Sequence, residues 1–94
     1  MFVIRETFTA RPGKASQLAQ VFKQVLPDMP ALKSRVLTDH IAQFNTVVLE
    51  TEVNDLAEFE KMMQEYMSRQ DLRDKMKGYT DLYQEGRREV YKIV

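Results

Sequence analysis

The sequence predicts an α+β fold in which a four-stranded antiparallel sheet carries helices on one face. The first observation is a central β-hairpin, because two runs rich in β-forming residues, 35–40 and 46–53, flank a short connection at 41–45. The second is an amphipathic helical pattern on each side of that hairpin. The third is an alternating β-rich run at each end of the chain. The predicted order is therefore strand, helix, strand, strand, helix, strand.

The first half of the chain begins with a predicted strand at residues 2–9. Phe2, Ile4 and Phe8 alternate with more polar residues there, and Glu6 is the exception on the apolar side. A turn through Pro12 and Gly13 leads into a helix over 15–26, which ends before Pro27 because proline disfavours helical geometry in the preceding residue. Residues 27–33 form the predicted linker to the hairpin.

The second half begins with a helix that Asn54 or Asp55 caps and that runs to about Ser68. We expect a break near Arg69 and a short third helix over 72–77, with Asp71 as its N-cap and Gly78 at its end. Gly86 is expected to release the last strand, residues 87–94.

This element order has one dominant solution, the ferredoxin-like βαββαβ fold, because right-handed crossovers place both helices on the same face of the sheet. The strand residues expected under the helices are Phe2, Ile4, Phe8, Val47, Leu49, Val53, Tyr91 and Ile93. The residues expected on the uncovered face are Val3, Arg5, Thr7, Val36, Thr38, His40, Val48, Glu50, Glu52, Arg88, Val90 and Lys92. For residues 35–40 the face stays ambiguous, because Leu37 and Ile41 compete with Val36.

Composition limits the functional classes. The 94 residues form a single predicted domain, 1–94, and 44% hydrophobic with 30% charged residues is typical of a folded soluble protein. The net charge is zero and the charges are interspersed, so we expect neither nucleic acid nor a membrane as a partner. Without cysteine there are no thiolate nucleophiles or zinc–thiolate sites, and no metal site is expected. A signal-peptide pattern is absent from the N-terminal residues, so the cytoplasm is the expected location.

Four segments resemble the dimeric α/β-barrel superfamily, which includes small NIPSNAP-like proteins and antibiotic-biosynthesis monooxygenases. They are Arg-Pro-Gly-Lys at 11–14, Val-Leu-Thr-Asp at 36–39, Phe-Asn-Thr-Val-Val-Leu-Glu at 44–50 and Gly-Arg-Arg-Glu-Val-Tyr at 86–91. The resemblance implies that two sheets pack face to face, so the partner of the uncovered face would be a second copy of the chain. It also implies a pocket between sheet and helices in each subunit.

Arg5, Glu50 and Arg88 are predicted on three adjacent strands of the uncovered face. Glu50 can pair with either arginine, which leaves one guanidinium to hold a carboxylate or enolate of a ligand. The alternative is that these residues form salt bridges in a barrel lumen or a dimer interface. Glu50 with Glu52 is weak evidence for paired catalytic carboxylates or a metal pair.

Two further ligand-binding candidates are His40 and Tyr66. His40 is the single histidine and is expected at the end of the second strand, either as a base or ligand or as a half-exposed polar residue. Tyr66 stands among Met62, Met63 and Met67 on the second helix, a face that lines a promiscuous pocket or fills a core. The resemblance implies a helix-borne histidine and a tryptophan for haem degradation; the chain has no tryptophan, so no cofactor is expected.

The resulting hypothesis is a homodimer that binds a small aromatic or polyketide-like molecule, with cofactor-independent oxygenation as a candidate reaction. The ligand class follows from the resemblance alone, and no catalytic residue is assigned. The alternative is a non-catalytic stress-response or regulatory interaction protein whose dimer is the functional unit. A filled space between sheet and helices would favour that alternative.

Overall fold

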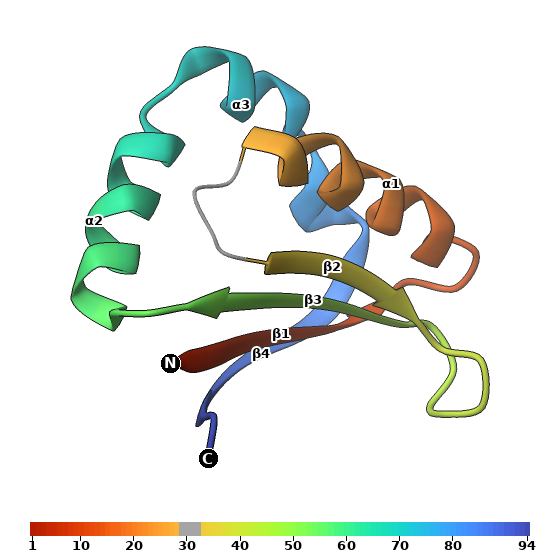
Figure 1. The fold of residues 1–94 in the computed structure, drawn as a ribbon. Coiled ribbons are helices and arrows are strands. Elements are labelled where there is room, and N and C mark those ends of the chain that lie inside the picture. The colour runs from red at the N-terminus through yellow and green to blue at the C-terminus, as the bar shows by residue number, and fades with distance from the viewer. Residues whose placement is uncertain (29–32) are drawn as a thin grey trace.

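The computed structural model describes residues 1–28 and 33–94, and its elements follow the predicted order (Figure 1). The strands are β1 (Phe2–Ala10), β2 (Lys33–Thr38), β3 (Thr46–Val53) and β4 (Tyr83–Lys92). The α-helices are α1 (Ala15–Val25), α2 (Leu56–Met67) and α3 (Gln70–Lys75), with short 3₁₀ turns at Leu26–Asp28 and Tyr79–Asp81. Part of the predicted linker, residues 29–32, lies outside the described residues.

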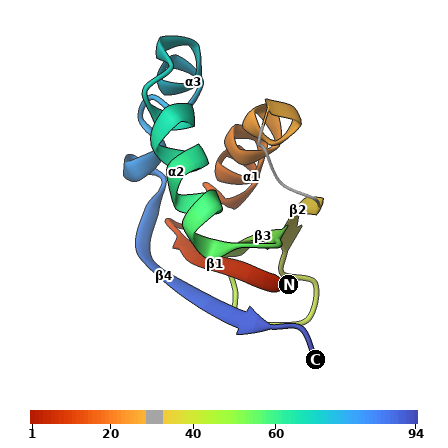
Figure 2. The same cartoon turned by 60° about the vertical axis from the view of Figure 1, so that its left-hand side comes forward.

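The four strands form one antiparallel sheet in the order β2-β3-β1-β4. The helices lie on one face of it, and the opposite face carries no helix (Figure 2). This arrangement confirms the ferredoxin-like α+β fold. None of the described helices is long and apolar enough to cross a membrane.

The register of β1 decides which side chains share a face. Glu6 stands opposite Leu49 of β3 and Arg88 of β4, whereas Arg5 stands opposite Glu50 and Glu89. Directly opposed residues of an antiparallel pair point to the same side. The even-numbered residues of β1 therefore face the helices, and the odd-numbered ones form what we call the open face.

The predicted start of the last strand is wrong, because β4 begins at Tyr83 instead of Arg87. Gly86 lies inside the strand and opposite Phe8. A Cβ atom at Gly86 would stand 3.0 Å from Cδ1 of the Phe8 ring, so the glycine gives that ring its space. The sequence predicts that Gly86 precedes the strand. In the structure it lies within the strand, and its missing side chain leaves room for the Phe8 ring.

The predicted faces of the last strand are also wrong. Tyr91 stands opposite Val3 on the open face, and Ile93, beyond the end of β4, is exposed. The residues predicted on the open face instead face the helices: Arg88, Val90 and Lys92 stand opposite Glu6, Ile4 and Phe2. Alternation sorts a strand into two sets of side chains, but only its pairing decides which set is covered.

The ambiguous face of β2 is resolved by its pairing with β3. Val36 stands opposite Leu49 and packs against the core, so its predicted place on the open face is wrong; Thr38, opposite Val47, is corrected in the same way. Leu37 takes the open face opposite Val48. His40 follows the end of the strand and is exposed.

Local signals at the helix ends are partly confirmed. The Asp55 carboxylate accepts hydrogen bonds from the backbone N–H groups of Ala57 and Glu58 at 2.8 and 3.3 Å, which makes it the N-cap of α2. The predicted break near Arg69 is present. Asp71 is not the cap of α3, because Arg69 holds that position and its guanidinium donates to the Asp71 carboxylate at 2.7 Å.

Candidate functional site

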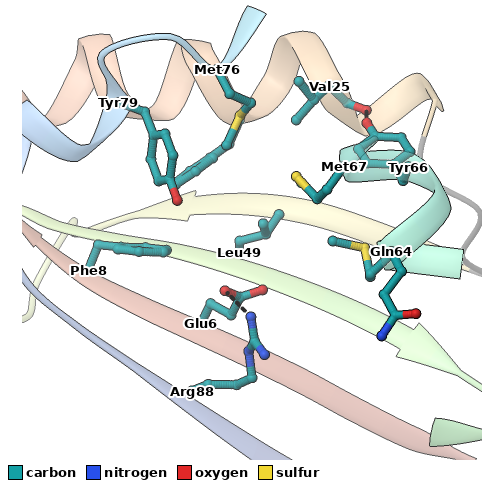
Figure 3. A pocket seen from close by; sticks show the side chains of 12 residues that line it. Glu6, Phe8, Val25, Leu49, Gln64, Tyr66, Met67, Met76, Tyr79 and Arg88 are labelled. Atoms are coloured by element: carbon teal, nitrogen blue, oxygen red, sulfur yellow. Dashed lines mark hydrogen bonds and ion pairs between the residues drawn. The ribbon is translucent and has the colours of Figure 1, made fainter. Parts of the chain in front are cut away.

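A cavity of about 420 Å³ lies between the sheet and the helices (Figure 3). Strands supply its floor, and α1, α2, the C-cap residue Met76 of α3 and the 3₁₀ turn at Tyr79–Asp81 supply its remaining walls. The residues that line it are Glu6, Phe8, Phe22, Val25, Leu49, Met63, Gln64, Tyr66, Met67, Met76, Tyr79 and Arg88. Aromatic rings, branched aliphatic chains and thioethers dominate this list, with few polar groups among them.

The charged groups of the cavity are a cross-strand pair on its floor. Arg88 Nη2 donates to Glu6 Oε2 at 3.2 Å, and the exposed fractions of the two side chains are 63% for Arg88 and 21% for Glu6. Glu6 follows the β1 alternation between the buried residues Ile4 and Phe8. The pair therefore places opposite charges on an otherwise apolar surface, and Figure 3 shows it below Leu49.

Tyr79 contributes a phenol from the helical side of the cavity. Its ring lies 6.2 Å from the Phe22 ring and 5.9 Å from the Tyr83 ring, between centroids. Figure 3 shows its hydroxyl directed toward the sheet. Burial raises the pKa of Tyr79 above its ordinary value, and the neighbouring Tyr83 adds to the shift. At neutral pH this phenol keeps its proton and can donate a hydrogen bond.

Tyr66, a predicted ligand residue, lies in the cavity wall but uses its hydroxyl elsewhere. The hydroxyl donates to the backbone carbonyl of Val25, which joins α2 to the end of α1. Burial raises the pKa of Tyr66, with the negative charge of Asp28 acting in the same direction. Its ring and the neighbouring Met63 and Met67 present their apolar atoms to the cavity.

The open face carries a row of alternating charges, one from each strand. Register places Arg35 of β2, Glu50 of β3, Arg5 of β1 and Glu89 of β4 side by side. We call these four residues the charge row. Arg35 Nη2 and Arg5 Nε lie 2.8 and 3.0 Å from the two carboxylate oxygens of Glu50.

Glu50 is the most enclosed member of the charge row, with 12% of its side chain exposed. The hydrogen bond from Arg35 lowers the pKa of Glu50 most strongly, burial opposes that effect, and Arg5 lowers the pKa further. The carboxylate is therefore held in its charged form. It serves as a bridge between two guanidinium groups and not as a proton-accepting base.

Tyr91 extends the charge row along β4. The guanidinium carbon of Arg5 lies 5.4 Å from the centroid of the Tyr91 ring, within the range of a cation–π contact. The Tyr91 hydroxyl donates to Glu89 at 2.7 Å, and this hydrogen bond raises the pKa of Tyr91 and lowers that of Glu89. A hollow of about 500 Å³ lies over this face, between the strands and residues Ala42 and Gln43 of the hairpin connection.

The structure thus brings together Arg5 and Glu50, as the sequence predicted, but places Arg88 on the other side of the sheet. Arg35 fills the place expected for Arg88, and sequence reasoning missed it because the face of β2 was ambiguous. Glu6 was also missed as a site residue. Its signal was present, since it interrupts an otherwise apolar alternation in β1.

His40 lies among exposed residues of the hairpin connection, where Ile41 and Phe44 are 93% and 83% exposed. The residues that line the cavity and the open-face hollow do not include it. Within residues 1–28 and 33–94, no three His, Cys, Asp or Glu side chains are grouped as metal ligands would be.

No family model matches the chain, and no curated protein matches it. Solved structures do. A NIPSNAP family protein of unknown function from Agrobacterium tumefaciens superposes with a TM-score of 0.86 at 13% identity, over 99% of this chain and 87% of that one.

A NIPSNAP-like domain protein from Burkholderia xenovorans gives a TM-score of 0.84 at 16% identity, over 99% of this chain and 84% of the other. A candidate antibiotic biosynthesis monooxygenase from Deinococcus radiodurans gives 0.72 at 14% identity, over 100% and 93%. At this level of identity the likeness concerns the fold. The chain has the ferredoxin-like fold of NIPSNAP and antibiotic-biosynthesis-monooxygenase structures along its whole length.

Proposed function

We propose that this protein is a homodimer that binds a small aromatic or polyketide-like molecule in the cavity between its sheet and its helices. The observation that carries the proposal is the cavity of about 420 Å³ itself. It is a cleft open to solvent and not a sealed void, because Met67 and Arg88 in its lining are exposed. A mostly apolar cleft of this volume is in the range of small-molecule sites, which supports a ligand.

The lining supports an aromatic occupant. The rings of Phe8 and Phe22 contact each other at a tilt, with centroids 5.0 Å apart, and both residues line the cavity. Met63, Met67 and Met76 surround the remaining volume. Methionine adapts to the shape of a ligand and makes favourable contacts between sulfur and aromatic rings. Such a lining gains affinity from burying a planar apolar molecule without demanding one particular shape.

Cofactor-independent oxygenation is the candidate reaction, in keeping with the solved structure described as a candidate monooxygenase. In such a reaction an anthrone-like hydroxyarene and one O₂ give a quinone and one water, and the electrons come from the substrate. The protein supplies orientation and a cation beside the substrate oxyanion. In this chain the cation that lines the cavity is Arg88.

Binding is tested with anthrone, a quinol and haem as probes, by thermal shift and by oxygen uptake. Met67→Trp should narrow the cavity and weaken binding of anthrone about tenfold or more, while the exposed Glu65→Trp on the same helix should leave it unchanged. Binding without oxygen uptake would remove the oxygenase but keep the ligand site. Silence toward all three probes would leave the non-catalytic interaction protein as the better account.

The open face supports a second copy of the chain as its partner. The charge row reads plus, minus, plus, minus across the sheet. A twofold axis parallel to the strands reverses this order in the partner subunit, so that Arg35 faces Glu89, and Glu50 faces Arg5. Every charge of the row then meets its opposite, which an axis perpendicular to the strands would not achieve. The exposed Leu37 and Tyr91 add apolar area to the same contact.

This pairing predicts complementation between two variants. Glu50→Arg places two positive charges opposite each other, and Arg5→Glu places two negative ones, so each variant alone should dimerise about 100-fold more weakly or worse. Mixed together, they should form a heterodimer, because each new charge meets an opposite one. Sedimentation equilibrium on the separate and mixed proteins measures this, with Glu60→Arg on the exposed face of α2 as control. A wild-type chain that stays monomeric at high concentration would refute the dimer.

A further inference from the structure

The Glu6–Arg88 pair on the cavity floor has hydrogen-bonding capacity that the fold does not use. A carboxylate can accept about four hydrogen bonds and a guanidinium can donate five. The single contact between Arg88 Nη2 and Glu6 Oε2 is the only hydrogen bond that either side chain makes within residues 1–28 and 33–94. A bidentate ion pair would have used two N–H donors of Arg88 and both carboxylate oxygens of Glu6.

Placing this pair on the helix-facing side has a cost that core packing does not explain. Neighbouring positions of β1 on that side are Ile4 and Phe8, both buried, and an apolar residue at position 6 would continue the core. Glu6 is the more enclosed of the two side chains, at 21% exposed against 63% for Arg88, and a carboxylate that is partly withdrawn from water needs compensating hydrogen bonds. Both side chains line the cavity, and Figure 3 shows the carboxylate and the guanidinium side by side.

The charges of the pair cancel, and this decides the class of ligand that fits. An anionic ligand would have to compete with Glu6 for Arg88, and a cationic one would compete with Arg88 for Glu6. A neutral ligand with a donor next to an acceptor completes both groups at once: its N–H or O–H donates to Glu6 while its carbonyl accepts from Arg88. Hydrogen bonds to charged groups are stronger than those between neutral groups, so these two contacts should contribute more binding free energy than the same contacts between neutral groups.

We propose that the Glu6–Arg88 pair recognises a neutral aromatic ligand whose edge carries a hydrogen-bond donor beside a carbonyl, as in a lactam or a hydroxy-ketone. The inference rests on the proposed ligand cavity and names the chemistry that this cavity selects. Phe8 and Phe22 contact the rings of such a ligand, and the pair fixes which edge points toward the sheet.

The test compares 2-quinolone with N-methyl-2-quinolone, two neutral bicyclic molecules that differ in the lactam N–H. Isothermal titration with the wild-type chain should give at least about tenfold tighter binding of 2-quinolone. Glu6→Gln, which keeps the side-chain volume, should reduce that preference to about threefold or less. Arg88→Met, which keeps the apolar stem and removes the donors, should weaken both ligands. Arg73→Met, an exposed position on α3, is the matched control and should change neither affinity.

The outcomes separate this inference from the proposed function. Equal affinity for the two quinolones, or a preference that Glu6→Gln leaves intact, overturns the inference and leaves the ligand cavity in place. Preference for 2-naphthoate over both quinolones also overturns it, because an anion would then be the favoured ligand. Failure of every bicyclic probe to bind overturns the cavity and the inference together. If Arg88→Met does not fold, as thermal unfolding would show, the near-isosteric Glu6→Gln still decides the question.

Discussion

The two faces of the sheet use the same strands for opposite purposes. Val47 is fully buried on the helix-facing side, whereas the next residue, Val48, lies on the open face among the members of the charge row. Among the described residues, the covered face holds the Glu6–Arg88 pair in an apolar setting. On the open face Glu50 pairs with Arg35 and Arg5, and Glu89 pairs with Arg87. The difference fits the two proposals, in which the first face encloses a small molecule and the second meets a polar, self-complementary surface.

The largest expected difference between the faces is in the free energy of unfolding when the same two methyl groups are removed from a valine on each face. Val47→Ala should reduce the free energy of unfolding by roughly 2 to 3 kcal/mol, because it deletes two buried methyl groups and leaves a cavity. Val48→Ala should cost less than about 1 kcal/mol in the isolated subunit. Urea unfolding at a low protein concentration measures both. Equal losses would mean that the open face is covered within the subunit itself.

A smaller difference in stability is expected between two tyrosine-to-phenylalanine variants, one at Tyr66 and one at Tyr91. Tyr66→Phe removes the donor to the Val25 carbonyl and should destabilise the protein by about 1 to 2 kcal/mol, because that carbonyl stays buried without its partner. Tyr91→Phe on the open face breaks a hydrogen bond to Glu89 that water can replace. We expect a change within about 0.5 kcal/mol there, by thermal unfolding of both variants. A larger loss at Tyr91 than at Tyr66 would contradict this ranking.

The smallest expected effect concerns acid stability on the open face. The folded-state pKa of Glu50 is lowered, chiefly by the hydrogen bond from Arg35, so the unfolded chain binds the proton more readily. The stabilisation is complete above the ordinary glutamate value of about 4.5 and is lost as pH falls through the lower folded pKa. Glu50→Gln should therefore show a shallower loss of stability below that pH than the wild type. Unfolding midpoints across an acid pH series test this, and parallel curves would contradict it.

Sequence reasoning reached the element order because local signals carry it. Asp55 caps α2, the β2–β3 hairpin has β-forming residues on both sides, and the periodicity of α1 is regular. The faces of β4 were missed for a non-local reason. Apolar residues fall on both alternating sets of this strand, and only its pairing with β1, which puts Arg88 opposite Glu6 and Val90 opposite Ile4, decides which set faces the helices.

For the candidate site, too, the positions of the residues placed by local signals were predicted correctly, and those of the residues placed by strand pairing were not. Arg5 and Glu50 were placed together because both strands lie at the centre of the sheet and alternate cleanly. Arg88 was assigned to the wrong side once the face of its strand was inverted. Its true partner, Glu6, needed both the β1–β4 register and the recognition that an acidic residue had interrupted an apolar alternation.

The alternation of β1 has a consequence for how this protein can change over generations. Under the two proposals Arg5 serves self-association and the adjacent Glu6 serves ligand choice, so a point substitution at one position leaves the other intact. Deleting or inserting a single residue in β1 would instead exchange the two surfaces and turn the guanidinium inward. Substitution can therefore diversify the ligand or the partner independently, whereas length variation within this strand should be absent among folded descendants.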